Sequence, residues 1–267
     1  MIFSYKNALI SYKIKGNRHK PVIAALHGFT ENRNMWKALY KALKQEFYFL
    51  LPDLLGHGKS TLTGEVLTME EQADMLKSLL DFQGIGKVNL IGHSMGGYIA
   101  LAFAEMYPER TESILLLNSH PFADDPDKVE ARKRSMDAAR QNKRKYLAET
   151  VPGFFASYHR EVFKGAIEKL VDDACKMPVE GITGALAGMM LRKDRSAMFF
   201  DSRNFRKGWI IAKDDPLIAP ELFEKKAENA KDLYFKIIDG GHMSYVENKE
   251  GMIAAVLDFF GTNNFNE

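Results

Sequence analysis

The chain has 267 residues, 46% of them hydrophobic, so it can bury a substantial core and bulk disorder is excluded. The 37 Lys and Arg residues nearly balance the 35 Asp and Glu residues, and this small positive charge predicts no nucleic-acid partner. A single cysteine, Cys175, excludes an internal disulfide and a metal site built from cysteines.

The amino-terminal segment has no pattern that would direct or anchor the chain. Residues 1–21 contain no apolar run of signal-peptide length and no small-residue cleavage site. No stretch of roughly 18 or more consecutive apolar residues is present. We therefore expect a soluble cytoplasmic protein with no membrane partner, and no residue pattern predicts its oligomeric state.

The first 120 residues alternate between strand patterns and helix patterns. Apolar alternation or continuous apolar runs predict strands at residues 8–16, 21–28, 47–60 (running into a glycine-rich loop), 87–92 and 112–119. Helical spacing predicts helices at 34–45, 68–84 and 95–107, and Thr68 with Glu71 forms a capping box at the start of the second. Such alternation predicts a mostly parallel sheet with helices on both faces.

The pattern changes after residue 120, where helical segments follow one another without a strand between them. Strand patterns return at residues 207–212 and 233–239, and helix patterns return from about residue 221 and at 249–261. We therefore expect an α/β core formed by residues 1–120 and 206–267, interrupted by an all-helical insertion at 121–205.

A basic stretch lies in this insertion. Residues 128–146 are rich in Lys and Arg, and Glu130 and Asp137 interrupt the run on an amphipathic pattern. A solvated helix face is the main interpretation of this stretch, and attraction of an anionic substrate or surface is the alternative.

A serine lies between glycines where a strand pattern gives way to a helix pattern, in the run Gly92-His93-Ser94-Met95-Gly96. A nucleophile on such a sharp turn has a strained backbone that thrusts its hydroxyl outward. Residues two before and two after it must be small, because strand and helix approach each other closely. We therefore predict that Ser94 is a covalent nucleophile.

A serine hydroxyl needs a general base to be activated at neutral pH. Of the seven histidines, His242 has the best position, on a glycine-flanked loop between the last predicted strand and the last helix. Open α/β sheets place their sites at such strand ends. His27, His57 and His93 also lie near strand ends, but each belongs to its own turn, and we expect them to brace loops.

The base in turn needs an orienting acid, expected between the nucleophile and the base in the sequence. Asp214 and Asp215 follow the first strand after the insertion. Asp215 is preferred because Pro216 fixes a turn directly after it, and Asp214 is the alternative. Asp53 precedes the nucleophile and lies in a glycine-rich turn, so we expect it to brace a loop that borders the site.

The oxyanion formed during acyl transfer needs hydrogen-bond donors. Phe29 follows a buried strand in the run "LHGF", where the glycine allows an open loop that presents the Phe29 N–H. Met95 presents a second N–H from the helix start, where amides are unpaired and the dipole favours negative charge. We expect both residues to contact the substrate, and we expect no cofactor and no metal.

The runs "HGF", "GHSMGG", "DDP" and "GGH" together resemble the α/β-hydrolase superfamily, across nearly the whole chain. The resemblance implies the α/β-hydrolase fold, with the insertion as a helical cap after the sixth strand. One departure is Ala212, where the motif leading to the acid often has glycine. The roles implied by the resemblance are Ser94 as nucleophile, His242 as base, Asp215 as acid, and Phe29 and Met95 as oxyanion donors.

Within this superfamily, haloalkane dehalogenases and epoxide hydrolases use an aspartate nucleophile, so the serine argues against those activities. Residues 26–36 also resemble the menaquinone-pathway synthase, which eliminates pyruvate with the same triad. That family usually carries arginine four residues after the nucleophile, where this chain has Tyr98. Cofactor-free haloperoxidases and carbon–carbon bond hydrolases share the triad as well.

The sequence thus favours a carboxylesterase-like serine hydrolase that cleaves a small carboxylic ester, thioester or lactone through an acyl-enzyme, with the cap forming the substrate pocket. The alternatives are a triad-dependent lyase or carbon–carbon hydrolase, and a non-catalytic ligand-binding protein of the same fold.

Overall fold

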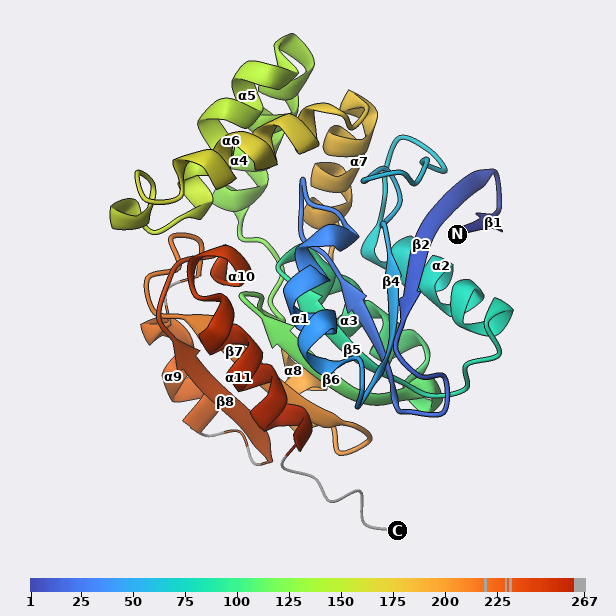
Figure 1. Cartoon of the computed structure of the whole chain (residues 1–267). Helices are drawn as coiled ribbons and strands as arrows, with labels where there is room; N and C mark the ends of the chain where they lie inside the picture. The colour runs from blue at the N-terminus through green and yellow to red at the C-terminus, as the bar shows by residue number, and fades with distance from the viewer. Residues whose placement is uncertain (219, 229, 231, 262–267) are drawn as a thin grey trace.

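An eight-stranded sheet runs through the centre of the protein in the order β1-β2-β4-β3-β5-β6-β7-β8 (Figure 1). This computed structural model describes residues 1–218, 220–228, 230 and 232–261. Strand β2 pairs antiparallel with β1 and β4, and every pair from β4 to β8 is parallel. The strands are β1 (Ile2–Tyr5), β2 (Ala8–Lys15), β3 (Val22–Leu26), β4 (Tyr48–Pro52), β5 (Val88–His93), β6 (Thr111–Leu117), β7 (Arg206–Ala212) and β8 (Leu233–Ile238).

Helices cover both faces of this sheet (Figure 1). Helices α1 and α11 pack against each other on one face, and α2 and α3 pack against each other on the opposite face. The helices of this part are α1 (Lys37–Leu43), α2 (Met69–Phe82), α3 (Met95–Met106), α9 (Glu221–Glu228), α10 (Ser244–Glu247) and α11 (Lys249–Gly261), with 3-10 turns η1 (Arg33–Trp36) and η2 (Pro108–Arg110). The predicted fold class, a mostly parallel sheet covered on both faces, is confirmed.

The central strands are apolar because both of their faces are covered. Every residue of β5 is buried, and so is every residue of β6 except Glu112. On the predicted capped helix α2, the Thr68 hydroxyl accepts a hydrogen bond from the Glu71 N–H at 3.1 Å. Local capping and two-sided burial therefore place the carboxyl ends of β3, β5, β6, β7 and β8 along one edge.

Between β6 and β7 the described chain contains helices and no strand. These are α4 (Pro126–Gln141), α5 (Lys143–Thr150), α6 (Lys164–Cys175), α7 (Val179–Met190) and α8 (Ser196–Asp201), with 3-10 turns η3 (Val151–Phe154) and η4 (Ser157–His159). Helices α4 to α7 lie beyond the carboxyl ends of the strands (Figure 1). Helix α8 packs on the sheet instead, where Phe199 contacts the Trp209 ring edge-on at 6.2 Å between centroids.

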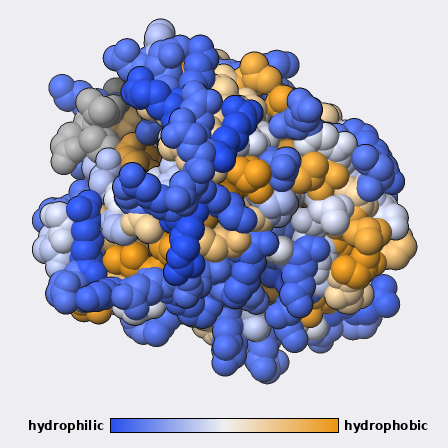
Figure 2. All heavy atoms as spheres, turned by 90° about the horizontal axis from the view of Figure 1, so that it is seen from above, coloured by the Kyte–Doolittle hydropathy of each residue, from blue (hydrophilic) through white to orange (hydrophobic). Residues whose placement is uncertain are grey.

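The division of the chain into a core and a cap at 121–205 stays a prediction, and residues 262–267 of the expected core lie outside the described residues. Seen from above, the face that carries α4 to α7 is largely hydrophilic, with smaller hydrophobic patches between the polar residues (Figure 2). Helix α4 buries Ala139 and leaves most of its basic residues in solvent, as expected for a solvated helix face. Within the described ranges, no helix combines the length and the apolar character needed to cross a membrane.

Candidate active site

Ser94 lies on a sharp turn between the end of β5 and the start of α3. Its φ of 50° and ψ of −117° are outside the regions that residues with a side chain prefer, a strain on the order of 1–3 kcal/mol. A Cβ atom on Gly92 would lie 2.3 Å from the Gly96 carbonyl oxygen, and one on Gly96 would lie 2.2 Å from that of Leu26. The glycines on either side of Ser94 are therefore required by the close approach of strand and helix.

The neighbouring strand holds this turn in place. The Ser94 N–H donates a hydrogen bond to the Leu117 carbonyl at 3.0 Å, and the Ser119 hydroxyl donates one to the Ser94 carbonyl at 2.8 Å. Both partners come from the end of β6 and the residues after it. The strained backbone is thus fixed by long-range contacts, and not by the turn alone.

His242 and Asp215 meet at the ends of β8 and β7. The His242 Nδ1 atom lies 2.8 Å from Asp215 Oδ2, and both side chains are almost fully buried. Burial alone would raise the pKa of Asp215, but His242 and hydrogen bonds from Asn118 and Leu217 outweigh it and lower the pKa below its usual value. An ionised Asp215 accepts a hydrogen bond from the Nδ1–H group, which leaves Nε2 of the ring unprotonated and available as a base.

Asp215 is held more firmly than its neighbour in the sequence. Its carboxylate also accepts hydrogen bonds from the Asn118 amide at 2.9 Å and from the Leu217 and Ile218 N–H groups at 2.8 and 3.1 Å. Asp214 instead accepts a hydrogen bond from the exposed Tyr158 hydroxyl at 2.6 Å. Of the two candidate acids, Asp215 is the one that contacts the histidine.

Ser94 and His242 line the same cavity, whose volume is about 220 Å³. Among the described residues, the Ser94 hydroxyl makes no hydrogen bond of 3.5 Å or less to the His242 ring. Catalytic hydrogen bonds are often long in ligand-free sites and tighten when substrate binds.

Of the two expected oxyanion donors, Phe29 lines this cavity. Met95 is not among its lining residues, but it is the first residue of α3 and directly follows Ser94, which is. Neither backbone N–H donates a hydrogen bond to any residue in the described ranges. Neither amide is therefore committed to a partner in this part of the structure.

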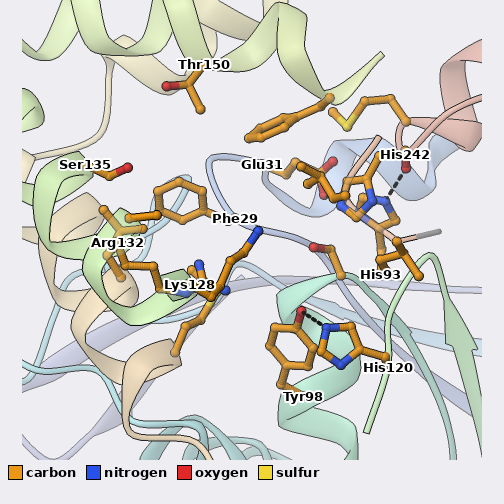
Figure 3. A pocket seen from close by; sticks show the side chains of 18 of the residues that line it. Phe29, Glu31, His93, Tyr98, His120, Lys128, Arg132, Ser135, Thr150 and His242 are labelled. Atoms are coloured by element: carbon orange, nitrogen blue, oxygen red, sulfur yellow. Dashed lines mark hydrogen bonds and ion pairs between the residues drawn. The ribbon is translucent and has the colours of Figure 1, made fainter. Parts of the chain in front are cut away.

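The inserted segment closes the other side of the cavity (Figure 3). It also contacts the loop that carries His242 directly, because the His242 N–H donates to the Phe154 carbonyl at 3.1 Å. The buried Glu247 carboxylate adds hydrogen bonds from the Ala156 N–H at 3.0 Å and from the His159 ring at 2.9 Å. Residues from this segment that line the cavity include Lys128, Arg132, Ser135, Tyr146, Phe154 and Leu186.

His27 and His57 brace loops, as expected. His27 Nε2 accepts from the Leu54 N–H at 3.0 Å, and His57 Nδ1 lies 3.0 Å from the Leu55 carbonyl. Burial first of all lowers the pKa of His27 to about 4 and that of His57 to about 3, so both rings are neutral at pH 7.

Asp53 is not among the residues that line the cavity, and it braces a loop. Its carboxylate pairs with the Arg33 guanidinium at 2.6 Å and accepts hydrogen bonds from the Arg33 and Lys59 N–H groups. In the described part of the chain, no group of three or more His, Cys, Asp or Glu side chains is arranged to hold a metal ion.

Two features of the site were not predicted from the sequence. Asn118 supports Asp215, and the buried Glu31 carboxylate pairs with His93 at 3.0 Å. The second ring nitrogen of His93 lies 2.8 Å from the His242 carbonyl oxygen. Asn118 could have been found by the rule that drew attention to Asp215, since it too is polar and follows a buried strand. Glu31 has no comparable signal.

Comparison with known proteins gives the same fold. A thermophilic esterase from Thermogutta terrifontis is 30% identical, with a TM-score of 0.88 over 95% of this chain and 93% of its own. The enol-lactonase of Burkholderia xenovorans has a TM-score of 0.88 at 23% identity, over 98% of this chain and 100% of its own.

Curated relatives match over a smaller part of their length. An uncharacterized protein of Mycobacterium tuberculosis is 30% identical over 118 residues, so the chain spans 33% of that relative's length and the match covers 44% of this chain. The family model for the alpha/beta hydrolase fold matches residues 21–164, which is more than half of the 267 residues. The chain belongs to the α/β-hydrolase fold family.

Proposed function

We propose that the protein is a serine hydrolase that cleaves a small carboxylic ester, thioester or lactone through an acyl-enzyme. The observation that carries the proposal is that His242 contacts Asp215 at 2.8 Å and lines one cavity together with Ser94. The chain order of these residues, serine before aspartate before histidine, is the one typical of this fold.

In the first half of the reaction, Ser94 Oγ attacks the substrate carbonyl carbon while His242 Nε2 takes the hydroxyl proton. Asp215 stays ionised and stabilises the imidazolium that forms. The carbonyl oxygen becomes an oxyanion, which accepts hydrogen bonds from the Phe29 and Met95 N–H groups. Each such donor contributes about 3 kcal/mol of transition-state stabilisation. Collapse of this intermediate breaks the ester bond, and the leaving alcohol or thiol takes the proton from His242.

In the second half, water replaces the alcohol. His242 takes a proton from the water molecule, whose oxygen attacks the acyl carbon. The second oxyanion occupies the same two amides. Its collapse releases the carboxylic acid, and Ser94 Oγ recovers its proton from the imidazolium.

We assign residues 121–205 the role of a cap, because α4, α5, the turn η3 and α7 all contribute residues to the cavity lining. The cavity of about 220 Å³ is below the range of about 300–1,000 Å³ typical for drug-sized ligands. The proposed substrates are therefore small.

Hydrolysis of 4-nitrophenyl acetate and butyrate by wild type and Ser94→Ala tests the proposal. We expect an initial burst of nitrophenolate equal to the enzyme concentration, followed by slower turnover, since nitrophenolate leaves on acylation and the acyl-enzyme accumulates when deacylation is the slower step. The Ser94→Ala variant loses the burst, and its kcat falls by roughly 10³-fold or more. Equal turnover by the variant would exclude the role given to Ser94.

A further inference from the structure

Lys128 places an unpartnered positive charge in the cavity. It lies in the first turn of α4, and its side chain extends into the cavity with the ammonium group toward the interior (Figure 3). Its backbone N–H donates to the Asp125 side chain at 2.7 Å. Its ammonium group, in contrast, has neither a hydrogen bond nor an ion pair within the described part of the chain.

The environment of this ammonium group is unfavourable to its charge. Lys128 is an exposed residue, but partial burial of its side chain against the cavity wall lowers its pKa, and the neighbouring Arg132 guanidinium lowers it further. Asp124 and Asp125 act in the opposite direction without reversing the shift. An anion that entered the cavity would relieve this situation.

Two other cations lie beside Lys128, but they share a single carboxylate. Asp124 pairs with Arg132 at 2.6 Å and with Arg192 at 2.7 Å, and all three side chains are largely or fully buried. One negative charge cannot neutralise two guanidinium groups, so this cluster adds to the positive potential. His120 adds no charge, because burial and then Arg192 lower its pKa to about 3.

The acidic residue on the opposite wall does not compensate this charge. Glu31 lines the cavity, but its carboxylate accepts from the Gly28 N–H at 2.6 Å and pairs with His93 at 3.0 Å. Burial would raise the pKa of Glu31, but the His93 charge outweighs it and lowers the pKa. The pair is therefore neutral overall, and the cavity carries a net positive potential on its α4 side.

We propose that Lys128 binds a carboxylate carried by the substrate, so that the enzyme acts on small anionic esters or lactones. The inference rests on the proposed function for its chemistry, but carboxylate recognition can be measured without turnover. Ser94 and Lys128 line one small cavity, which allows a single short molecule to place its acyl carbon at one and its carboxylate at the other. The carboxylate of the substrate then becomes the ion-pair partner of the Lys128 ammonium group.

Matched substrates test this recognition. Monomethyl succinate and methyl succinamate have the same shape, but the first carries a carboxylate where the second carries a neutral amide. Monomethyl glutarate and methyl glutaramate repeat the comparison with one more methylene. Methanol release gives kcat/KM for each ester, and the ratio of the anionic to the neutral value measures the preference for charge.

We expect wild type to prefer the anionic esters and Lys128→Met to reduce the ratio by about 10- to 100-fold, the effect of losing a hydrogen bond between charged groups. Lys128→Arg keeps the charge and retains most of the preference. Lys133→Met is the matched control, because Lys133 lies on the same helix, is exposed and pairs with Glu130 at 2.6 Å. This control keeps the wild-type ratio. A ratio that Lys128→Met leaves unchanged would overturn the proposal.

Binding to the inactive protein separates this inference from the proposed function. Calorimetric titration of Ser94→Ala with monomethyl succinate and methyl succinamate is compared with that of the Ser94→Ala, Lys128→Met double variant. If the protein binds the anionic ester more tightly through Lys128 but wild type cleaves no ester, carboxylate recognition stands and the proposed hydrolase activity is refuted. If cleavage depends on Ser94 but Lys128→Met changes neither the kcat/KM ratio nor the binding preference for the anionic ester, the hydrolase activity stands and carboxylate recognition is refuted.

Discussion

The two walls of the cavity differ in how their charged groups are held. On the sheet side, the carboxylate of Asp215 accepts hydrogen bonds from His242, Asn118 and two backbone amides, and Glu31 pairs with His93 in the buried interior. On the α4 side, the ammonium of Lys128 has no partner among the described residues.

Single glycines of the two regions also differ in how closely the main chain packs around them. A Cβ atom on Gly92 or Gly96 would collide with the neighbouring main chain, whereas one on Gly153 or Gly165 in the inserted segment would meet nothing within 4 Å. Helix α7 of the same segment differs from these two positions, because a Cβ atom on Gly188 would collide with the Leu67 carbonyl. Groups that perform a reaction must be fixed before the substrate arrives, because any reorganisation adds to the barrier. Groups that select a substrate can remain unpaired until it binds. In our account, the sheet edge supplies the chemistry and the helices supply the selectivity.

The largest effect is expected from a substitution on the sheet side of the cavity. Asp215→Asn removes the negative charge beside His242 and favours the wrong ring tautomer, so we expect kcat for ester hydrolysis to fall by about 10⁴-fold. Asp214→Asn is the matched control, since Asp214 bonds to Tyr158 at the surface, and its kcat stays near that of wild type. Comparable losses in both variants would contradict the assignment of the acid.

A second change tests the buried pair beneath the site. Glu31→Gln leaves His93 without its partner, and breaking a fully buried ion pair lowers the free energy of unfolding by about 3–5 kcal/mol. Urea denaturation measures this loss. Glu130→Gln is the control, because the Glu130–Lys133 pair is exposed and such pairs contribute about 0–1 kcal/mol.

The pH dependence of stability tests the Glu31–His93 pair more specifically. Burial would lower the pKa of His93, but Glu31 outweighs it and raises the pKa above 6.5. The stabilisation of the fold by protonated His93 is therefore present below pH 6.5 and is lost as pH rises through the folded pKa. The lowered pKa of Glu31 means that its contribution is present above pH 4.5 and lost as pH falls through the folded value. In Glu31→Gln the alkaline loss disappears, and an unchanged pH profile would argue against the ion pair.

The smallest effects are expected on stability, from alanine substitutions of one glycine near Ser94 and one glycine in the inserted segment. Gly96→Ala forces a side chain onto the Leu26 carbonyl and should destabilise the fold by about 1–3 kcal/mol. Gly165→Ala, in the first turn of α6 with open space around it, should stabilise by up to about 1 kcal/mol because alanine favours the helix. Thermal denaturation measures both shifts. Equal shifts of the same sign would remove the contrast between the two regions.

Much of the sheet could be predicted from the sequence because its strands are continuous apolar runs between helical patterns. Seven of the strands, β2 to β8, lie within or overlap the expected segments. Strand β1 was missed, since it has only four residues, Ile2–Tyr5, lies at the sheet edge and buries only Tyr5. Apolar periodicity reveals a strand only where burial imposes it.

The site divides in the same way. Ser94, Asp215 and His242 could be identified because strand ends and glycine turns mark their positions in the sequence. Lys128 could not be told apart from the other basic residues of α4, because only the path of that helix across the cavity decides which of its lysines turns inward. Glu31 was likewise hidden, since its partner His93 lies 62 positions away.

Covalent labelling with a fluorophosphonate tests most directly whether Ser94 is an activated nucleophile. Intact-mass analysis followed by peptide mapping of wild type, Ser94→Ala, His242→Ala and Ser135→Ala distinguishes the groups, because Ser135 lines the same cavity from α4. We predict one adduct per chain on the peptide that contains Ser94, its absence in Ser94→Ala, strongly slowed formation in His242→Ala, and its retention in Ser135→Ala. A wild-type protein that stays unlabelled, or a Ser94→Ala protein that labels as fast as wild type, would contradict the account.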